Sequence, residues 1–178
     1  MKPLYLSFAP PNKWRKISQS RLLKNKEWKE IRKNIILRDN SKCNYCGYKS
    51  DKYQIVDHID GNPENNEIEN MQVICQMCNL IKHAGQGCVI TNVVDLYKTS
   101  KYNQNAIINI TRKMRDEERE DFEIIQFLGL REKVHFKMDR NYLQKLYGFI
   151  TSRTSLKEDM YFKWLIYHKE HRGRIINS

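Results

Sequence analysis

Two Cys-x-x-Cys pairs constrain the fold of this chain more than any other feature of its sequence. The pairs are Cys43/Cys46 and Cys75/Cys78, and roughly thirty residues separate them, a spacing at which two short knuckles can supply four tetrahedral zinc ligands. Two disulfides would instead require an oxidising compartment, and the chain does not start with the pattern of a secretory leader. We therefore expect one structural Zn²⁺ held by the four thiolates. The fifth cysteine, Cys88, is expected to be a small buried residue.

The segment between the two pairs predicts a β-hairpin. Residues 53–56 and 71–74 have the β-branched and aromatic content of strands, whereas residues 60–66 are dense in turn formers, asparagines among them. The adjacent Asp57 and His58 follow the first strand directly. The hairpin would therefore deliver both side chains from one strand end.

The order and spacing of several short stretches carry a family resemblance. They are residues 38–39, 43–47, 56–59 and 70–79, followed by Lys82. Together, over roughly residues 25–84, they resemble the HNH nuclease family, also called the ββα-metal fold. The resemblance implies a hairpin that carries the His, then a helix that carries the last motif residue, with a metal ion between them.

Matched position by position, the resemblance implies a role for each motif residue. Asp57 and Asn79 would be metal ligands, His58 the general base, and Asn70 the residue that holds the hairpin loop. Asn79 stands where many family members have His, so the ligand set stays open. His83, one helical turn later, could face the same site.

The chemistry of these residue types fits hydrolysis of a phosphodiester bond. Carboxylate and amide oxygens suit one catalytic Mg²⁺ or Mn²⁺ better than they suit zinc. An imidazole with a pKa near neutrality can take a proton from water, a step that typically contributes about 10²- to 10⁴-fold in rate. The ion would hold the scissile phosphate and neutralise the charge that develops on its oxygens. Lys82 is expected to be either a phosphate contact or a solvated helix residue.

The distribution of charge favours double-stranded DNA as the partner. The 178-residue chain has a net charge of +11. Residues 1–42 hold 12 Lys/Arg and 3 Asp/Glu, residues 43–84 hold 3 and 6, and residues 85–178 hold 17 and 12. Basic flanks would grip a polyanion while the mildly acidic middle holds cations. Because no apolar run reaches membrane-spanning length, we expect a soluble, cytoplasmic protein with no membrane partner.

The N-terminal flank is predicted to be a basic arm over residues 1–24, followed by a helix over residues 25–37. The helix would pack on the zinc unit through three apolar residues on one face: Trp28, Ile31 and Ile35. Beside them, a basic stripe could follow a phosphate backbone; its members are Lys26, Lys29 and Lys33. The arm could dock on the protein's own surface or lie along DNA, and the sequence leaves both open.

The C-terminal flank, residues 85–178, is predicted to be a mainly helical region for DNA recognition or dimerisation. It would begin where Gly85 and Gly87 break the helix of the zinc unit. The expected elements are helices over residues 115–128, 139–151 and 156–169 and a short strand over residues 134–138. The candidate DNA contacts are Arg112, Lys113, Arg115, Arg153, Lys163, Arg172 and Arg174.

These features predict an α+β protein with a basic arm (1–24), an HNH-like unit (25–84) and a C-terminal region (85–178). The expected activity is metal-dependent DNA cleavage, and the resemblance implies 5′-phosphate and 3′-hydroxyl products. Such a small, basic, stand-alone chain resembles a type II-like restriction endonuclease, which would act on a palindromic site as a homodimer. Two alternatives stay open. One is a homing or phage-type endonuclease of the same family, and the other is a non-catalytic zinc-ribbon DNA-binding regulator.

Overall fold

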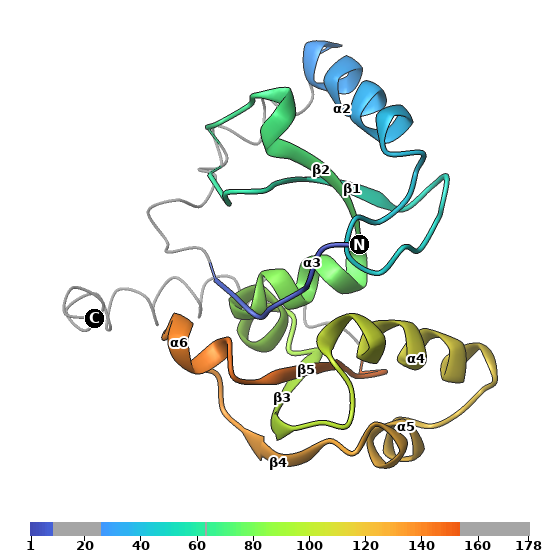
Figure 1. The fold of residues 1–178 in the computed structure, drawn as a ribbon, viewed down its shortest axis with the longest axis vertical. Coiled ribbons are helices and arrows are strands. Elements are labelled where there is room, and N and C mark those ends of the chain that lie inside the picture. The colour runs from blue at the N-terminus through green and yellow to red at the C-terminus, as the bar shows by residue number, and fades with distance from the viewer. Residues whose placement is uncertain (9–25, 63, 154–178) are drawn as a thin grey trace. The chain divides into compact units, whose positions relative to one another are not determined.

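The computed structural model describes residues 1–8, 26–62 and 64–153, which fall into two compact units (Figure 1). The first unit contains residues 1–2 and the described residues up to Asn79, and the second contains residues 3–8 and those from Leu80 onward. The arm expected over residues 9–24 and the helix expected over residues 156–169 lie outside the described residues.

The first described element of the first unit is helix α2, Lys26–Arg38. Its sequence is rich in Lys, Glu and Arg, which are good helix formers, and its apolar residues recur every three to four positions. Ile35 is buried and packs on the strand residue Val73, while Trp28 and Ile31 border the same cluster. The predicted helix is therefore confirmed, and its apolar face packs on the hairpin.

The predicted hairpin is also confirmed. Strand β1, Gln54–His58, pairs antiparallel with β2, Met71–Cys75, so that Asp57 lies directly opposite Gln72. A short 3-10 turn, η3 (Ile68–Asn70), leads into β2. Helix α3, Gln76–Lys82, follows β2 without a loop. The order strand, strand, helix is the one that the family resemblance implies.

The second unit is built on a three-stranded antiparallel sheet with the order β4-β3-β5. The strands are β3 (Val94–Thr99), β4 (Arg131–Val134) and β5 (Tyr147–Ile150). The helices are α4 (Gln104–Asp116), α5 (Asp121–Leu128) and the short α6 (Arg140–Leu143). Their shared core consists of Tyr97, Ile107, Ile124, Leu128, Leu130 and Phe149. The chain thus combines helices and strands in both units, as the α+β class requires.

The helix predicted over residues 115–128 is two helices. The first begins eleven residues earlier, at Gln104, because the side chain of Asn103 accepts a hydrogen bond from the backbone of Ala106 and caps it. A turn at residues 117–120 separates it from α5, which starts with a capping box between Glu120 and Glu123. The C-terminal end is as expected, with Gly129 in the left-handed conformation.

The helix predicted over residues 139–151 is wrong. Only α6 is helical, and residues 147–150 form strand β5, which pairs with the central strand β3. Tyr, Phe and Ile favour strands, and glycine disfavours a helix interior. Gly148 also allows close packing, because a Cβ there would lie 2.6 Å from Cδ1 of Ile81. The strand expected over residues 134–138 lies earlier, at Arg131–Val134.

The glycines after α3 do not break it. The helix already ends at Lys82, and Gly85 has ordinary right-handed helical angles ahead of the π-helical turn η4, Gln86–Ile90. Gly87 is buried in this turn, where a Cβ would lie 2.6 Å from Cγ2 of Val94. Its role is therefore close packing against β3.

Residues 3–8 show where one part of the predicted N-terminal arm lies. Leu4, Leu6 and Phe8 are buried in the second unit, whereas Tyr5 between them is exposed. The backbone N–H of Leu4 donates to Asn105 in α4 at 2.9 Å. This part of the arm docks on the protein itself.

Candidate active site

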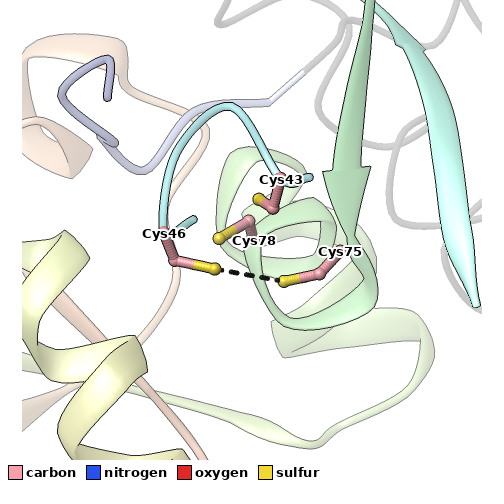
Figure 2. Close-up of side chains that lie close together, drawn as sticks. All are labelled: Cys43, Cys46, Cys75 and Cys78. Carbon is pink, nitrogen blue, oxygen red and sulfur yellow. Dashed lines mark hydrogen bonds between the residues drawn. The ribbon is translucent and has the colours of Figure 1, made fainter. Parts of the chain in front are cut away.

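The four predicted zinc ligands form one buried cluster (Figure 2). Their Sγ atoms all lie within 4.8 Å of one another, and the Sγ atoms of Cys46 and Cys75 are 3.6 Å apart. With Zn–S bonds of about 2.3 Å, a tetrahedral site has S···S distances of about 3.8 Å, so the cluster has the size that zinc needs. None of the four forms a disulfide, which argues against the alternative interpretation.

Local backbone structure shapes both knuckles. In the first, Gly47 has a φ of +77° and donates to the carbonyl of Cys43 at 2.9 Å, which closes a tight turn. In the second, Cys75 ends β2 and Cys78 lies in the first turn of α3. Hydrogen bonds from Cys43, and then from Cys75 and Cys78, lower the pKa of Cys46, whereas hydrogen bonds with Cys43 and Cys46 raise the pKa of Cys75 and Cys78. The cluster therefore favours the thiolate, the form that binds metal, at Cys46 and disfavours it at Cys75 and Cys78.

Asp39, just after α2, forms hydrogen bonds that connect the helix, the first knuckle and β2. One carboxylate oxygen accepts from the backbone N–H of Val73 and from the side chain of Asn44, both at 2.8 Å, and the other accepts from Arg38 at 2.8 Å. Arg38 also donates to the carbonyl of Met71. Burial opposes ionisation, but the hydrogen bonds from Arg38, Val73 and Asn44 lower the pKa of Asp39. The sequence placed these two residues in the motif without indicating this role.

Asn70 spans the base of the hairpin loop. Its Oδ1 accepts from the backbone N–H of Asp60 at 3.1 Å, and its Nδ2 donates to Asp60 Oδ1 at 3.0 Å and to the carbonyl of Asn65 at 2.9 Å. Hydrogen bonds, the largest from the backbone N–H of Asn62, lower the pKa of Asp60 to about 2. These contacts join Asn70 to the loop, and its role in holding the loop beside Asp57 and His58 stays a prediction.

Asp57 is 7% exposed and lies in a buried polar network. Its Oδ2 accepts from Nε2 of Gln72 at 3.2 Å, and the same Nε2 lies 3.1 Å from the hydroxyl of Tyr45. Sequence reasoning assigned no role to Gln72 or Tyr45. The register of the predicted hairpin could have indicated Gln72, because it lies directly opposite Asp57.

His58 is also 7% exposed and is held on two sides. Its ring stacks on Trp28 of α2, with centroids 6.5 Å apart and planes inclined by 15°. Its Nε2 lies 3.2 Å from Oδ1 of Asn66. Since an amide oxygen only accepts, this contact is a hydrogen bond when the ring carries a proton on Nε2. Trp28 was expected only as a packing residue, and Asn66 only as a turn residue.

The remaining motif residues lie on and after α3. Asn79 is half-buried in the middle of the helix, and its role as a metal ligand stays a prediction. Lys82 is buried at the end of α3, so the interpretation as a solvated residue does not fit, and the phosphate contact stays a prediction. His83 follows the helix and is half-buried.

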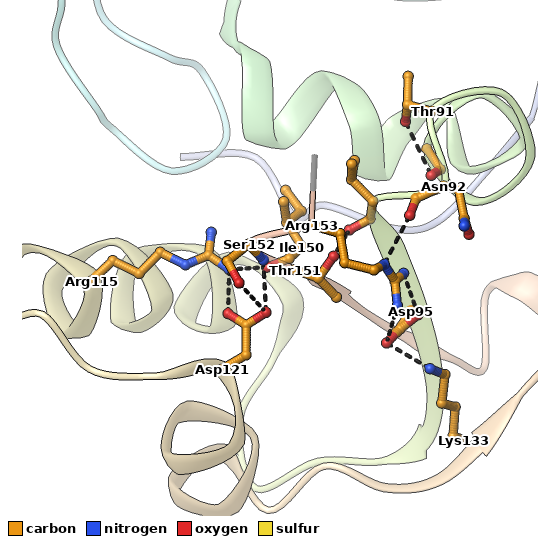
Figure 3. A network of polar contacts seen from close by, with 12 residues as sticks. Thr91, Asn92, Asp95, Arg115, Asp121, Lys133, Ile150, Thr151, Ser152 and Arg153 are labelled. Atoms are coloured by element: carbon orange, nitrogen blue, oxygen red, sulfur yellow. Dashed lines mark hydrogen bonds and ion pairs between the residues drawn. The ribbon is translucent and has the colours of Figure 1, made fainter. Parts of the chain in front are cut away.

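The predicted DNA contacts differ in how far they are exposed. All three lysines of the basic stripe are exposed on α2, and Arg112 is half-buried on α4. Arg115 is held internally (Figure 3): it donates to Asp121 at 2.8 Å and to the carbonyl of Ile150, and it lies 5.7 Å above the ring of Phe149. Arg115 therefore connects α4, α5 and β5.

Arg153 is also part of a fold contact, because it pairs with Asp95 at 2.7 Å, and Lys133 pairs with the same carboxylate at 2.8 Å (Figure 3).

Burial raises the pKa of the half-buried Cys88 to about 12, so this thiol is a poor nucleophile. Within residues 1–8, 26–62 and 64–153, no helix is both long and apolar enough to cross a membrane.

Comparison with known proteins identifies the segment that carries the site. Residues 43–85 match the model of the HNH endonuclease family. A stretch of 70 residues is 30% identical to the type 4 apparatus protein DotN of Legionella pneumophila. This stretch covers 39% of the chain and 32% of that relative, so the match spans about a third of the relative's length. The resemblance to HNH endonucleases is thus confirmed for residues 43–85, with the four-cysteine knuckle inside them.

Proposed function

We propose that this protein is a metal-dependent DNA endonuclease with an HNH-type active site. The observation that carries the proposal is the position of Asp57 and His58, adjacent at the end of β1 within a segment that matches the HNH endonuclease family. The hairpin is held by buried contacts, and the loop behind it is held by the hydrogen bonds of Asn70. A site held in this way is suited to chemistry that needs a defined geometry.

His58 acts as the general base. Its Nε2 proton is directed to Asn66, so Nδ1 accepts the proton from the attacking water. The stack on Trp28 fixes the plane of the ring, and therefore the direction in which Nδ1 points. These two contacts hold the base in one tautomer and one orientation. The free-energy cost of orienting the ring is therefore met on folding and does not add to the reaction barrier.

Asp57 and Asn79 hold one Mg²⁺ or Mn²⁺, because a carboxylate and an amide offer the oxygen donors that these hard cations prefer. The bound ion supplies electrostatic stabilisation of the phosphate and of the leaving 3′ oxygen. The structural Zn²⁺ has a separate role in holding the two knuckles. Cleavage by this route leaves a 5′ phosphate and a 3′ hydroxyl.

The basic stripe on α2 binds the phosphate backbone of double-stranded DNA, and the basic flanks supply the base contacts that select a site. We assign the protein to the type II-like restriction endonucleases, with homing or phage-type endonucleases as the alternative. A homodimer on a short palindrome supports the former, and a monomer on a long asymmetric site supports the latter. Sedimentation of the protein alone and with the DNA that it cleaves measures the oligomeric state and so distinguishes the two classes.

The test is cleavage of a mixed DNA library by the zinc-loaded protein with Mg²⁺ or Mn²⁺, followed by sequencing of the ends. His58→Ala should lose cleavage by about 10²-fold or more while it keeps its affinity for DNA, because the base is not needed to hold phosphates. If His58→Ala cuts as fast as the wild type, the proposed mechanism is wrong.

A second function is supported by two observations. Asp57 and His58 are each only 7% exposed, and the curated relative DotN is named as an apparatus protein. Both fit a zinc-stabilised subunit of a larger assembly that keeps the HNH architecture without cutting DNA. Absence of cleavage by the fully zinc-loaded wild type, with either cation and with unmodified and modified DNA, would favour this function.

A further inference from the structure

A network of hydrogen bonds in the first unit converges on Gln72, which is 1% exposed. Its Nε2 lies 3.2 Å from Oδ2 of Asp57 and 3.1 Å from the hydroxyl of Tyr45. Its Oε1 accepts from Nζ of Lys2 at 3.3 Å. The amide therefore has partners on both of its ends.

The chemistry of the partners fixes the orientation of this amide. A lysine ammonium can only donate, and an ionised carboxylate can only accept. Rotating the amide by half a turn would set its NH₂ against Lys2 and its oxygen against Asp57, with repulsion at both ends. Gln72 therefore keeps its NH₂ directed at the carboxylate of Asp57.

The network is anchored in the first zinc knuckle. Tyr45 lies between the two cysteines of that knuckle, and its side chain is buried. Lys2 reaches the same knuckle through its backbone, because its N–H donates to the carbonyl of Asn44 at 3.0 Å. The structural metal site and the carboxylate of Asp57 are therefore connected through a short chain of hydrogen bonds.

We propose that Gln72 is a positioning residue for Asp57, and that Lys2 and Tyr45 act through Gln72. This inference rests on the proposed role of Asp57 as a ligand of the catalytic cation. A carboxylate ligand must present its oxygens in a defined direction, and neighbouring donors that hold it typically contribute about 10- to 100-fold in metal affinity. Gln72 supplies such a donor. The charge of Lys2 polarises the amide and holds it in this orientation.

The inference is tested by measuring the affinity of the full-length, zinc-loaded protein for Mn²⁺ without DNA, with electron paramagnetic resonance as the readout. Gln72→Met keeps the length of the side chain and removes the amide, and it should weaken Mn²⁺ binding about ten-fold or more with unchanged zinc content. The matched control is Gln54→Met. Gln54 is another buried glutamine of the hairpin, and its amide donates to the carbonyls of Ser41 and Tyr48 instead. This control should bind Mn²⁺ like the wild type, even if it is less stable.

Lys2→Met provides a variant that does not disturb packing, because Lys2 is exposed. It should weaken Mn²⁺ binding by a smaller factor, about three-fold. Combined with Gln72→Met it should cause no further loss, because Lys2 acts through Gln72. Additive losses would overturn the role of Lys2, and wild-type Mn²⁺ affinity in Gln72→Met would overturn the role of Gln72.

The same measurement separates this inference from the proposed nuclease. Asp57→Ala should abolish the tight Mn²⁺ site, and if it binds Mn²⁺ like the wild type, Asp57 is no ligand and both proposals fail. A wild-type protein that needs Asp57 and Gln72 for Mn²⁺ but cuts no DNA would refute the nuclease and support the positioning role.

Discussion

Two ion pairs of the second unit have the same length but different surroundings, and their removal should have different effects. Arg115 and Asp121 are 2.8 Å apart with side chains 28% and 23% exposed, whereas Lys98 and Glu132 are 2.8 Å apart with side chains 55% and 60% exposed. Asp121 also accepts from the backbone N–H of Ser152 at 2.7 Å and from its hydroxyl at 3.0 Å. Substituting Asp121→Asn therefore weakens three charge-assisted hydrogen bonds.

Each of these bonds loses about 1 kcal/mol when the carboxylate becomes a neutral amide, since charge-assisted bonds contribute about twice as much as neutral ones. Partial exposure of the pair reduces the sum, so we expect Asp121→Asn to lower the free energy of unfolding by about 2 kcal/mol. Glu132→Gln, in the exposed pair, should leave the free energy of unfolding nearly unchanged, because water screens this pair. Urea unfolding followed by circular dichroism measures both.

The effect should depend on pH in a defined direction. Burial opposes ionisation, yet the hydrogen bonds from Ser152 and Arg115 lower the pKa of Asp121 in the folded state. A carboxyl with a lowered pKa stabilises the fold above its unfolded-state value near 4, and this contribution is lost as the pH falls through the folded-state pKa. The difference between wild type and Asp121→Asn should therefore shrink below about pH 4. Equal effects of Asp121→Asn and Glu132→Gln at pH 7, or a difference that persists at low pH, would refute this reasoning.

Three further predictions concern the first unit. Cys78→Ser should lose the zinc, measured by elemental analysis, and with it the folded state of the unit, because small zinc units gain much of their stability from the ion. Asp39→Ala should destabilise the unit by about 3 kcal/mol in urea unfolding, since it leaves the N–H of the buried Val73 without its acceptor, whereas Asp60→Ala in the exposed loop should cost less than about 1 kcal/mol. Changing all three lysines of the basic stripe to Gln should weaken DNA binding and lower the slope of log K against log salt by up to about 2.7, whereas unchanged salt dependence would exclude the stripe from the interface.

The sequence predicted the first unit well because its signals are local. Cysteine spacing defines the zinc cluster, alternation and turn residues define the hairpin, and the three- to four-residue spacing of Trp28, Ile31 and Ile35 defines α2. The second unit depends on long-range pairing instead. Residues 147–150 become a strand because they pair with residues of β3 that lie fifty or more positions earlier, and no local pattern in residues 139–151 indicates that partner.

The supporting residues of the site were missed for a related reason. Gln72, Asn66 and Trp28 are chemically ordinary residues whose importance comes from what they face. Asn66 reads as one more turn former in a loop with several, and Trp28 as one more apolar residue of a helix face. Only Gln72 could have been found from sequence, by writing the predicted hairpin in register and reading the residue opposite Asp57.

Helix α2 combines two features that the proposed function needs together. Its exposed face carries the basic stripe, and its packed face places Trp28 against the ring of His58. At its end, Arg38 donates to the carbonyl of Met71, the strand residue paired with His58. A shift of the helix would therefore move the lysines and disturb the orientation of the base at the same time. Under the proposed function, contact with the phosphate backbone and alignment of His58 as the general base would therefore be coupled through one helix, and DNA bound on the stripe would meet a base that is already oriented.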